Sequence, residues 1–349
     1  MTEQEILQHD NRNMRRLLVE FPLQIEDALR IANRARVHLN TRRIQNIVVT
    51  GLGGSAIGGD LLRSFLADEL SIPLIVNRHY FLPDFVDARS LVIVSSYSGN
   101  TEETISSHKD AAKRKAQVLC VSSNGVTEQL AKKYKHPLVK IPVGFPPRAA
   151  LGYSFFPVLV VLTRLGIVKA KVAQIKETVA LLREKAKEFA VLDQGANKAL
   201  ALAMRLYNKL PVVYSSAEWF DSVNLRWRGQ LCENAKVLAF GHVVPEMNHN
   251  ELVGWNVLKP QMKQIAVVLL RDARMHPRVA VRMNVMKTII SQYAAEIIEA
   301  ESEGRSLLAR MFSLIYLGDW ASFYLAILNG VDPTPVKVID YLKNELAKV

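Results

Sequence analysis

The sequence predicts an α/β protein with two doubly wound parallel sheets, each a three-layer sandwich with helices on both faces. Short apolar runs rich in valine and isoleucine, typical of strands buried on both faces, alternate with segments of helical spacing. Two of these runs, 47–50 and 91–95, lead into helices through loops of glycine and serine. A similar alternation returns after residue 210, which indicates a duplicated fold.

The first half of the chain follows this pattern most clearly. Residues 5–36 read as helical, with a break imposed by Pro22, and form a predicted N-terminal segment over 1–36. A first domain is predicted over 37–166. Its predicted strands are 47–50, 73–76, 91–95, 118–121 and 138–141, and its predicted helices are 56–67, 101–116 and 126–134.

A charged amphipathic segment over 169–189 leads into a second predicted domain over 167–349, which ends in a C-terminal helix. The predicted strands of this domain are 211–214, 237–240, 264–270 and 295–298, and its main predicted helices are 219–233, 279–293 and 307–328. The segment SSAEW, 215–219, replaces the glycine loop and lacks the glycines that let a backbone close on a phosphate. We therefore expect this domain to supply chemistry rather than a phosphate clamp.

Composition excludes several classes of protein. The net charge of +12 comes from basic residues spread over predicted helical faces, and nothing in the sequence resembles a helix-turn-helix, so nucleic-acid binding is not expected. The N-terminal sequence has no signal peptide pattern. The apolar stretch 155–162 contains Pro157 and is shorter than the ~20 residues of a membrane span. We therefore expect a cytoplasmic protein with no membrane partner.

Cysteine and histidine give little guidance. Cys120 and Cys232 form neither a disulfide framework nor a metal cluster in sequence. No role is assigned to the isolated histidines, which are His9, His38, His79, His108, His136 and His276.

The loop after 91–95 has the chemistry of an anion site. It reads SSYSGNT, and Asn100 with Glu103 has the spacing of a capping box that would begin a helix. Backbone N–H groups at a helix N-terminus attract anions. The loop has no lysine and no P-loop pattern, which argues against a nucleoside triphosphate. A serine-rich turn that only caps a helix has the same appearance, so this loop alone leaves both readings open.

The second loop, GLGGSAIGGD over 51–60, would lie at the same edge of a parallel sheet, where such sheets bind ligands. The GGS sequence ending at Ser55 and the pattern SxSGxT over 96–101 resemble the sugar isomerase (SIS) domain, whose loops hold the phosphate of a phosphosugar. The resemblance implies a phosphate site formed by Gly54, Ser55, Ser96, Ser98 and Thr101.

The second half contains groups suited to proton transfer. Gln230 and Glu233 share one face of a predicted helix, and Glu233 falls at its carboxyl end, where the helix dipole disfavours a charged carboxylate. His249 has two amides and two carboxylates as neighbours, which can fix the tautomer of an imidazole. Arg148 follows a Pro-Pro turn at the mouth of the sheet. The alternatives are a solvated surface residue for Glu233, a polar loop with a helix cap for His249 and a surface charge for Arg148.

Three later motifs narrow the resemblance: ENAK at 233–236, PEMNHNE at 245–251 and DPTPVKVIDYLK at 332–343. In this order they resemble the bifunctional phosphoglucose/phosphomannose isomerase family over nearly the whole chain. The resemblance implies an isomerase that converts glucose 6-phosphate and mannose 6-phosphate to fructose 6-phosphate through a cis-enediol, without metal or organic cofactor.

The resemblance also implies roles for individual residues. Glu233 would be the base, and Arg148 would stabilise the charge of the enediolate. His249, from the partner subunit of a homodimer, and Lys343 would assist opening of the sugar ring. Thr334 is mapped to the threonine that leaves room for both C2 epimers.

Two other functions are compatible with parts of the sequence. The pattern G-x-G-x-x-A over 51–56, with Arg78 after the next strand, is typical of an NADP-dependent reductase, but it leaves the later motifs unexplained. A non-catalytic phosphosugar sensor would keep the serine loops without needing Glu233, His249 and Lys343 together.

Overall fold

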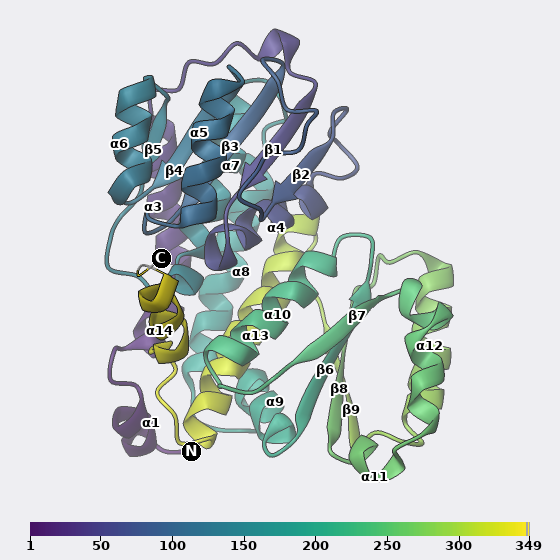
Figure 1. Ribbon diagram of the computed structural model, residues 1–349. Coiled ribbons are helices and arrows are strands. Elements are labelled where there is room, and N and C mark those ends of the chain that lie inside the picture. Colours follow the sequence, from purple (N-terminus) through teal and green to yellow (C-terminus); the bar gives the residue numbers. More distant parts are fainter. Residues whose placement is uncertain (347, 349) are drawn as a thin grey trace. The chain divides into compact units, whose positions relative to one another are not determined.

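The structure, a computed structural model, describes residues 1–346 and 348 and divides into two compact units (Figure 1). One unit holds Glu20–Leu182 with Gly304–Ala309. The other holds Met1–Val19, Arg183–Glu303 and Arg310–Val349. Each unit is built on its own parallel sheet, as the sequence predicts. The predicted domain boundaries stay a prediction.

The unit of residues 20–182 contains a five-stranded parallel sheet of order β2-β1-β3-β4-β5. The predicted strands of this sheet are confirmed to within one residue at each end. They are β1 (Asn46–Thr50), β2 (Leu74–Asn77), β3 (Ser90–Ser96), β4 (Gln117–Ser122) and β5 (Leu138–Lys140). Every residue of the central strand β3 is buried, which explains why it reads as a continuous run of β-branched and small residues.

Helices cover both faces of this sheet (Figure 1). One face carries α5 (Glu102–Lys113) and α6 (Gly125–Tyr134), and on the other α3 (Phe21–Arg34), α4 (Ile57–Phe65) and α7 (Leu151–Arg164) pack together. The sequence did not predict α7, because it contains Pro157. A proline inside a helix removes one backbone hydrogen bond without forcing the helix to end. The helix α8 (Val172–Ala190) confirms the predicted amphipathic segment.

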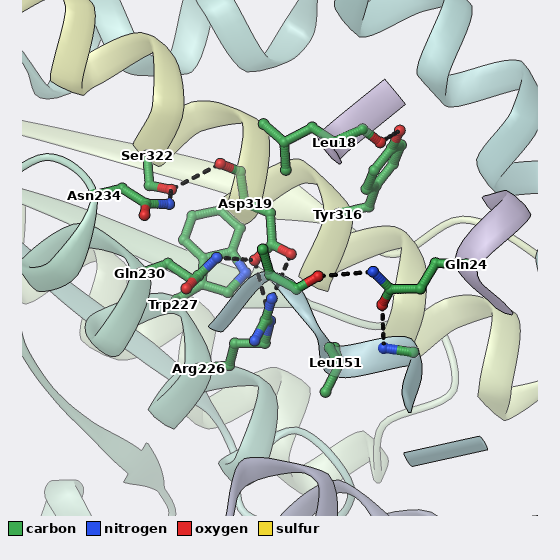
Figure 2. Close-up of polar contacts among 12 residues, drawn as sticks. Leu18, Gln24, Leu151, Arg226, Trp227, Gln230, Asn234, Tyr316, Asp319 and Ser322 are labelled. Atoms are coloured by element: carbon green, nitrogen blue, oxygen red, sulfur yellow. Dashed lines mark hydrogen bonds and ion pairs between the residues drawn. The ribbon is translucent and has the colours of Figure 1, made fainter. Parts of the chain in front are cut away.

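The N-terminal segment is three helices rather than one helix with a break. The helices α1 (Glu3–His9) and α2 (Met14–Val19) precede α3, and Pro22 lies in the first turn of α3, where the missing N–H costs nothing. The hydroxyl of Tyr316 donates to the carbonyl of Leu18 at 2.7 Å, which fixes the end of α2 within its unit (Figure 2).

The other unit contains a four-stranded parallel sheet of order β7-β6-β8-β9. This order repeats β2-β1-β3-β4 of the first sheet, which agrees with the duplication expected from the sequence. The strands are β6 (Leu210–Ser216), β7 (Phe240–Val244), β8 (Ile265–Arg271) and β9 (Glu296–Glu301). The prediction of a strand over 237–240 is wrong, because β7 begins at Phe240, where it pairs with Val212 of β6.

The helices of this sheet are also divided between its faces (Figure 1). The helix α12 (Pro277–Ile290) covers one face over a core of methionine, valine and aromatic side chains. On the other face lie α9 (Lys198–Leu206), α10 (Asp221–Glu233) and α13 (Leu307–Leu328). The short α11 (Lys259–Met262) and the C-terminal α14 (Lys337–Leu346) complete this unit.

One helix within the described residues is long and apolar enough to cross a membrane by length and composition, namely α13. However, 94% of its 18-residue apolar window is buried inside the protein. Its large side chains Trp320, Tyr316 and Tyr324 are fully buried. The helix is therefore a core helix of a soluble fold rather than a membrane span.

Candidate active site

The two glycine- and serine-containing loops meet at one edge of the five-stranded sheet. Both follow the carboxyl ends of neighbouring parallel strands, β1 and β3. The backbone N–H of Tyr97 donates to the hydroxyl of Ser55 at 2.9 Å, and the Ser95 hydroxyl donates to the Ser55 carbonyl at 3.1 Å. These two contacts join the loops into one structure. Since Ser55 accepts from Tyr97, its own hydroxyl proton is left to donate to a bound anion.

The second loop presents further hydroxyl groups. The buried Ser96 hydroxyl lies 3.2 Å from the hydroxyl of Thr101, the residue that precedes α5. One of these two groups donates to the other, so the pair retains one proton for a ligand. Ser98 is exposed and accepts from the backbone of Asn100 at 3.3 Å. Together with the N-terminus of α5, these groups form a neutral donor set suited to an anion.

The capping box predicted for Asn100 and Glu103 is wrong. The helix begins one residue later, after Thr101, and Thr101 makes no side-chain capping bond. The side chain of Asn100 instead accepts from the backbone N–H of Val126, at the start of α6, at 3.1 Å. A long-range partner competes here with the local one, and spacing alone does not reveal it.

A third segment, the short turn η3 (Pro147–Ala149), lies directly against the first loop. A Cβ atom on Gly54 would lie 2.6 Å from the Pro147 carbonyl oxygen and 2.8 Å from the Arg148 nitrogen, so only glycine allows this approach. Arg148 is buried. The structure thus brings Gly54, Ser55 and Arg148 into one neighbourhood, and their role in a shared site stays a prediction.

The η3 turn is held from its other side by Gln24 of α3 (Figure 2). Its amide donates to the Ala149 carbonyl at 2.9 Å and accepts from the backbone N–H of Gly152 at 2.8 Å. Tyr97 adds a further link, because its hydroxyl accepts from the backbone of Phe145 at 2.8 Å. The segment that carries Arg148 is therefore fixed before any ligand binds.

The ion pair of Arg78 in the same unit is evidence against an NADP-dependent reductase. Arg78, which would hold the 2′-phosphate of NADP, instead forms an ion pair with the buried carboxylate of Asp60. A guanidinium paired in this way is not available for a phosphate without loss of that ion pair.

In the other unit, Glu233 is the last residue of α10, as predicted. The helix is anchored to α13 by a buried polar network, shown in Figure 2. The Arg226 guanidinium binds both oxygens of Asp319, at 3.1 and 2.6 Å, and the Gln230 amide donates to Asp319 at 3.0 Å. Burial raises the pKa of the Asp319 carboxyl, and the neighbouring Arg226 opposes that rise.

Two further contacts hold the same helix pair. The Trp227 indole N–H donates to the Leu314 carbonyl at 2.8 Å, and the Asn234 amide donates to the Ser322 hydroxyl at 2.9 Å (Figure 2). A Cβ atom on Gly318 would lie 2.5 Å from the Trp227 ring, so α13 must carry glycine there. The position of Glu233 at the end of α10 is thus set by packing and by satisfied polar groups.

Lys236 links the end of α10 to the segment that carries Thr334. Its ammonium group donates to the backbone carbonyls of Glu233, at 2.5 Å, and of Pro333, at 3.2 Å. Thr334 is buried, and its backbone N–H donates to the Asp332 carboxylate at 2.8 Å. The structure therefore places Thr334 close to the end of the helix that ends in Glu233.

His249 lies elsewhere in this unit. It ends the turn η4 (Glu246–His249), which follows the carboxyl end of β7, and it is exposed. Glu233 is at the other end of the β6–α10–β7 unit, because α10 starts after the carboxyl end of β6 and runs back along the sheet. The 13 residues of α10 span about 18 Å. The two residues therefore lie at opposite edges of one sheet within a single chain.

Lys343 lies on α14 and is exposed. None of the residues of this helix is buried. Large apolar side chains are exposed along it, namely Val338, Ile339, Tyr341, Leu342 and Leu346. An amphipathic helix with an uncovered apolar face is typical of a surface that packs against another chain.

Sequence reasoning missed several residues that shape these sites. Asp319 and Gln24 carried no local signal, since their partners are distant in the chain. The expectation that His108 and His136 stand alone is wrong, because their ring nitrogens lie 2.9 Å apart. Lys236 is the last residue of the ENAK motif. Its position three residues after Glu233 is the sequence signal that could have indicated its contact with the end of the helix.

Comparisons with known proteins agree with the geometry. Residues 195–346 match a family model described as the bacterial phospho-glucose isomerase C-terminal SIS domain. A bifunctional phosphoglucose/phosphomannose isomerase of Caldicellulosiruptor bescii is 44% identical over 94% of this chain and 97% of its own length. Its counterpart in Aquifex aeolicus is 38% identical over 87% of this chain and 91% of its own. A hypothetical protein from Thermus thermophilus shares the fold, with a TM-score of 0.71 at 13% identity, over 99% of this chain and 93% of that one.

Proposed function

The chain belongs to the bifunctional phosphoglucose/phosphomannose isomerase family, and we propose that it converts glucose 6-phosphate and mannose 6-phosphate to fructose 6-phosphate and back. The observation that carries the proposal is the joining of the Ser55 loop, the 96–101 loop and the Arg148 turn at one edge of a parallel sheet. Such an edge is where open α/β sheets bind ligands.

The phosphate group of the substrate binds to the Ser55 loop and the 96–101 loop. Ser55, Ser98 and the pair of Ser96 and Thr101 bind it through hydroxyl groups, with one proton available from that pair, and the N-terminus of α5 adds its backbone dipole. Gly54 allows the loop to approach the Arg148 turn. The phosphate is remote from C1 and C2 of the sugar, so its binding supplies orientation rather than chemistry.

Glu233 is the base of the isomerisation. It removes the proton on C2 of the open-chain aldose and returns it to C1, while a proton passes from O2 to O1, which gives the ketose. The intermediate is a cis-enediol or its enediolate. The buried Arg148 stabilises the negative charge that develops on the oxygens of that intermediate. The network of Arg226, Gln230 and Asp319 positions the helix that carries Glu233.

Thr334 leaves room for both epimers at C2, so one site accepts the glucose and the mannose phosphate. The link from Glu233 through Lys236 to Pro333 supports this role, because it brings Thr334 near the base. A wider side chain at this position would favour one epimer over the other.

His249 of the partner subunit and Lys343 open the ring of the cyclic sugar. The separation of Glu233 from His249 in one chain supports a shared site, since the two residues lie at opposite edges of the same sheet. A homodimer supplies His249 to the site of the other subunit. The exposed apolar side chains of α14, which carries Lys343, support association between chains. We place this dimer in the cytoplasm.

A coupled assay on the purified protein tests the proposal. Fructose 6-phosphate formed from glucose 6-phosphate and from mannose 6-phosphate is measured separately, with a chelator present in a parallel sample. Turnover of both sugars is expected. Binding of both phosphosugars with no turnover of either would instead identify a sensor, and a cofactor-dependent absorbance change would identify a reductase.

A further inference from the structure

Three side chains with metal-binding atoms face one another outside the candidate active site. They are His108 on α5, Cys120 in β4 and His136 just before β5. Nε2 of His108 lies 2.9 Å from Nδ1 of His136 and 3.6 Å from the sulfur of Cys120. All three ligand atoms lie within 4.8 Å of one another.

The backbone holds this cluster in place. The N–H of Cys120 donates to the carbonyl of Pro137 at 2.9 Å, and Cys120 pairs with Leu138 across the two strands. The N–H of His136 donates to the Ala131 carbonyl at 2.8 Å, after α6 ends in a left-handed Lys135. The main chain therefore fixes the Cys120 and His136 backbones beside each other, independently of any ligand.

The two separations measured from His108 Nε2 are close to those of a tetrahedral zinc site, and the Cys120 sulfur and His136 nitrogen lie within 4.8 Å of each other. Bonds of about 2.0–2.1 Å to nitrogen and about 2.3 Å to sulfur place the ligands about 3.4 Å apart for two nitrogens and about 3.6 Å apart for nitrogen and sulfur. The sulfur–nitrogen separation of 3.6 Å already matches. The two imidazoles need to separate by about half an ångström, a shift within reach of side-chain rotation.

Only one nitrogen of the His108 imidazole takes part in the contacts of the cluster. In the contact between His108 and His136, one imidazole donates its N–H to a ring nitrogen of the other, so one ring nitrogen of each residue is used. The other ring nitrogen of His108, Nδ1, is buried without a hydrogen-bond partner among the described residues. His108 is 0% exposed, so water does not replace that partner from the surface. A metal bound through Nε2 does not reach Nδ1, so this unpaired nitrogen does not distinguish a metal site from the hydrogen-bonded pair.

Burial shifts the pKa of each of the three side chains. Burial lowers the pKa of His108 to about 4, with a further contribution from His136, and burial lowers the pKa of His136 as well. Burial raises the pKa of the Cys120 thiol to about 12.

The cluster is reached from solvent on the side of His136. A surface hollow of about 310 Å³ is lined there by Arg36, His38, Lys132, Lys135, His136 and Leu138. Of the three ligand residues, only His136 lines this hollow, so a water ligand would approach from its side. The three basic side chains at its mouth repel a free cation, so the affinity is lower than in a closed site with four protein ligands.

We propose that His108, Cys120 and His136 bind one zinc ion, with water as the fourth ligand. A sulfur and two imidazoles are the donor set that zinc accepts, and magnesium and calcium prefer oxygen. The site ties α5 to β4 and to the start of β5, so its effect is on the stability of this unit. Its ligands are none of the residues assigned to the isomerase reaction, and the inference stands whether or not that reaction is confirmed.

Cobalt(II) is the probe that tests the site, since a thiolate bound to cobalt gives an intense charge-transfer band. The intact protein, freed of metal with a chelator, is titrated with cobalt and then with zinc. We expect a thiolate band that saturates at one equivalent and disappears when zinc is added. The chain contains two cysteines, so Cys232→Ser is the matched control for Cys120→Ser. The band should persist in Cys232→Ser and be absent in Cys120→Ser.

A second variant keeps the test decisive if Cys120→Ser does not fold. His136 is only half-buried, so His136→Gln should fold and melt close to the metal-free wild type. Zinc should raise the melting temperature of the wild type and leave that of His136→Gln unchanged. Absence of a thiolate band in the folded wild type would overturn the proposal. An equal effect of zinc on the wild type and on His136→Gln would do the same.

Discussion

The hydroxyl oxygen of Ser55 lies 2.9 Å from the backbone nitrogen of Tyr97 and accepts its hydrogen bond. This contact crosses from the loop after β1 to the loop after β3. The serine at this position therefore holds the second loop in place, and in the function we propose it also donates its proton to the phosphate. The two loops carry the GGS sequence and the SxSGxT pattern, which resemble those of the SIS domain.

Replacement of Ser55 with alanine removes both interactions. A hydrogen bond to a charged group contributes about 1.5–3 kcal/mol, so we expect KM for glucose 6-phosphate to rise about 10- to 100-fold in Ser55→Ala. Turnover at saturation should change less, because the base is untouched. Steady-state kinetics measure both values. The exposed Ser291→Ala is the control, and equal effects in the two variants would contradict the role of Ser55.

Gly54→Ala tests the contact between the first loop and the Arg148 turn. The added methyl group would lie 2.6 Å from the Pro147 carbonyl oxygen, a separation that requires backbone movement. We expect a loss of activity of at least tenfold and lower stability, measured by kinetics and by urea unfolding. Gly229→Ala is the matched control, since its methyl group meets nothing within 4 Å. An active and stable Gly54→Ala protein would show that the turn does not depend on this approach.

The sheet of the first unit could be predicted well from sequence, because buried parallel strands are continuous apolar runs. The strand β7 could not be predicted from the sequence. It is an edge strand that begins at the exposed Phe240 and contains Gly241, so it lacks a buried β-branched run. Its position is set by pairing with β6, which is a tertiary effect.

The residues of the candidate site also divide into those that the sequence indicates and those that only the fold reveals. Serines and glycines next to strands were found because their loops have a recognisable composition, and Ser55 and Tyr97 prove to be in contact. The partners of Asn100, Gln24 and Asp319 were not found, since each bond joins segments far apart in the chain. Cys120 and the two histidines beside it come together through the fold alone.

Lys236→Met tests whether the link to Pro333 positions the base. The ammonium group holds two backbone carbonyls, and methionine keeps most of the length of the side chain without any donor. We expect kcat to fall about tenfold with little change in phosphosugar affinity, because a small displacement of the base is enough to slow proton transfer. Lys209→Met is the control, since Lys209 donates in the same way to the Arg205 carbonyl at 2.7 Å. A normal kcat in Lys236→Met would remove the positioning role.

A mixture of two inactive variants tests the shared site. In a dimer of His249→Ala with Glu233→Gln, one site receives the native Glu233 of one chain and the native His249 of the other. Random mixing of subunits should therefore restore about a quarter of wild-type activity. The mixture is assayed after reversible unfolding and refolding, with each variant alone treated identically. Activity that stays at the level of the separate variants would mean that each site draws both residues from one chain.

The most direct measurement compares turnover and phosphosugar affinity in Glu233→Gln. The amide keeps the size of the side chain but cannot carry a proton between two carbons. General base catalysis contributes about 10²- to 10⁴-fold, so we expect turnover to fall by that factor while binding of glucose 6-phosphate is retained. The same change at Glu218, Glu246 and Glu251 provides controls, because these carboxylates accept hydrogen bonds that an amide can also accept. Turnover close to wild type in Glu233→Gln would contradict its assignment as the base.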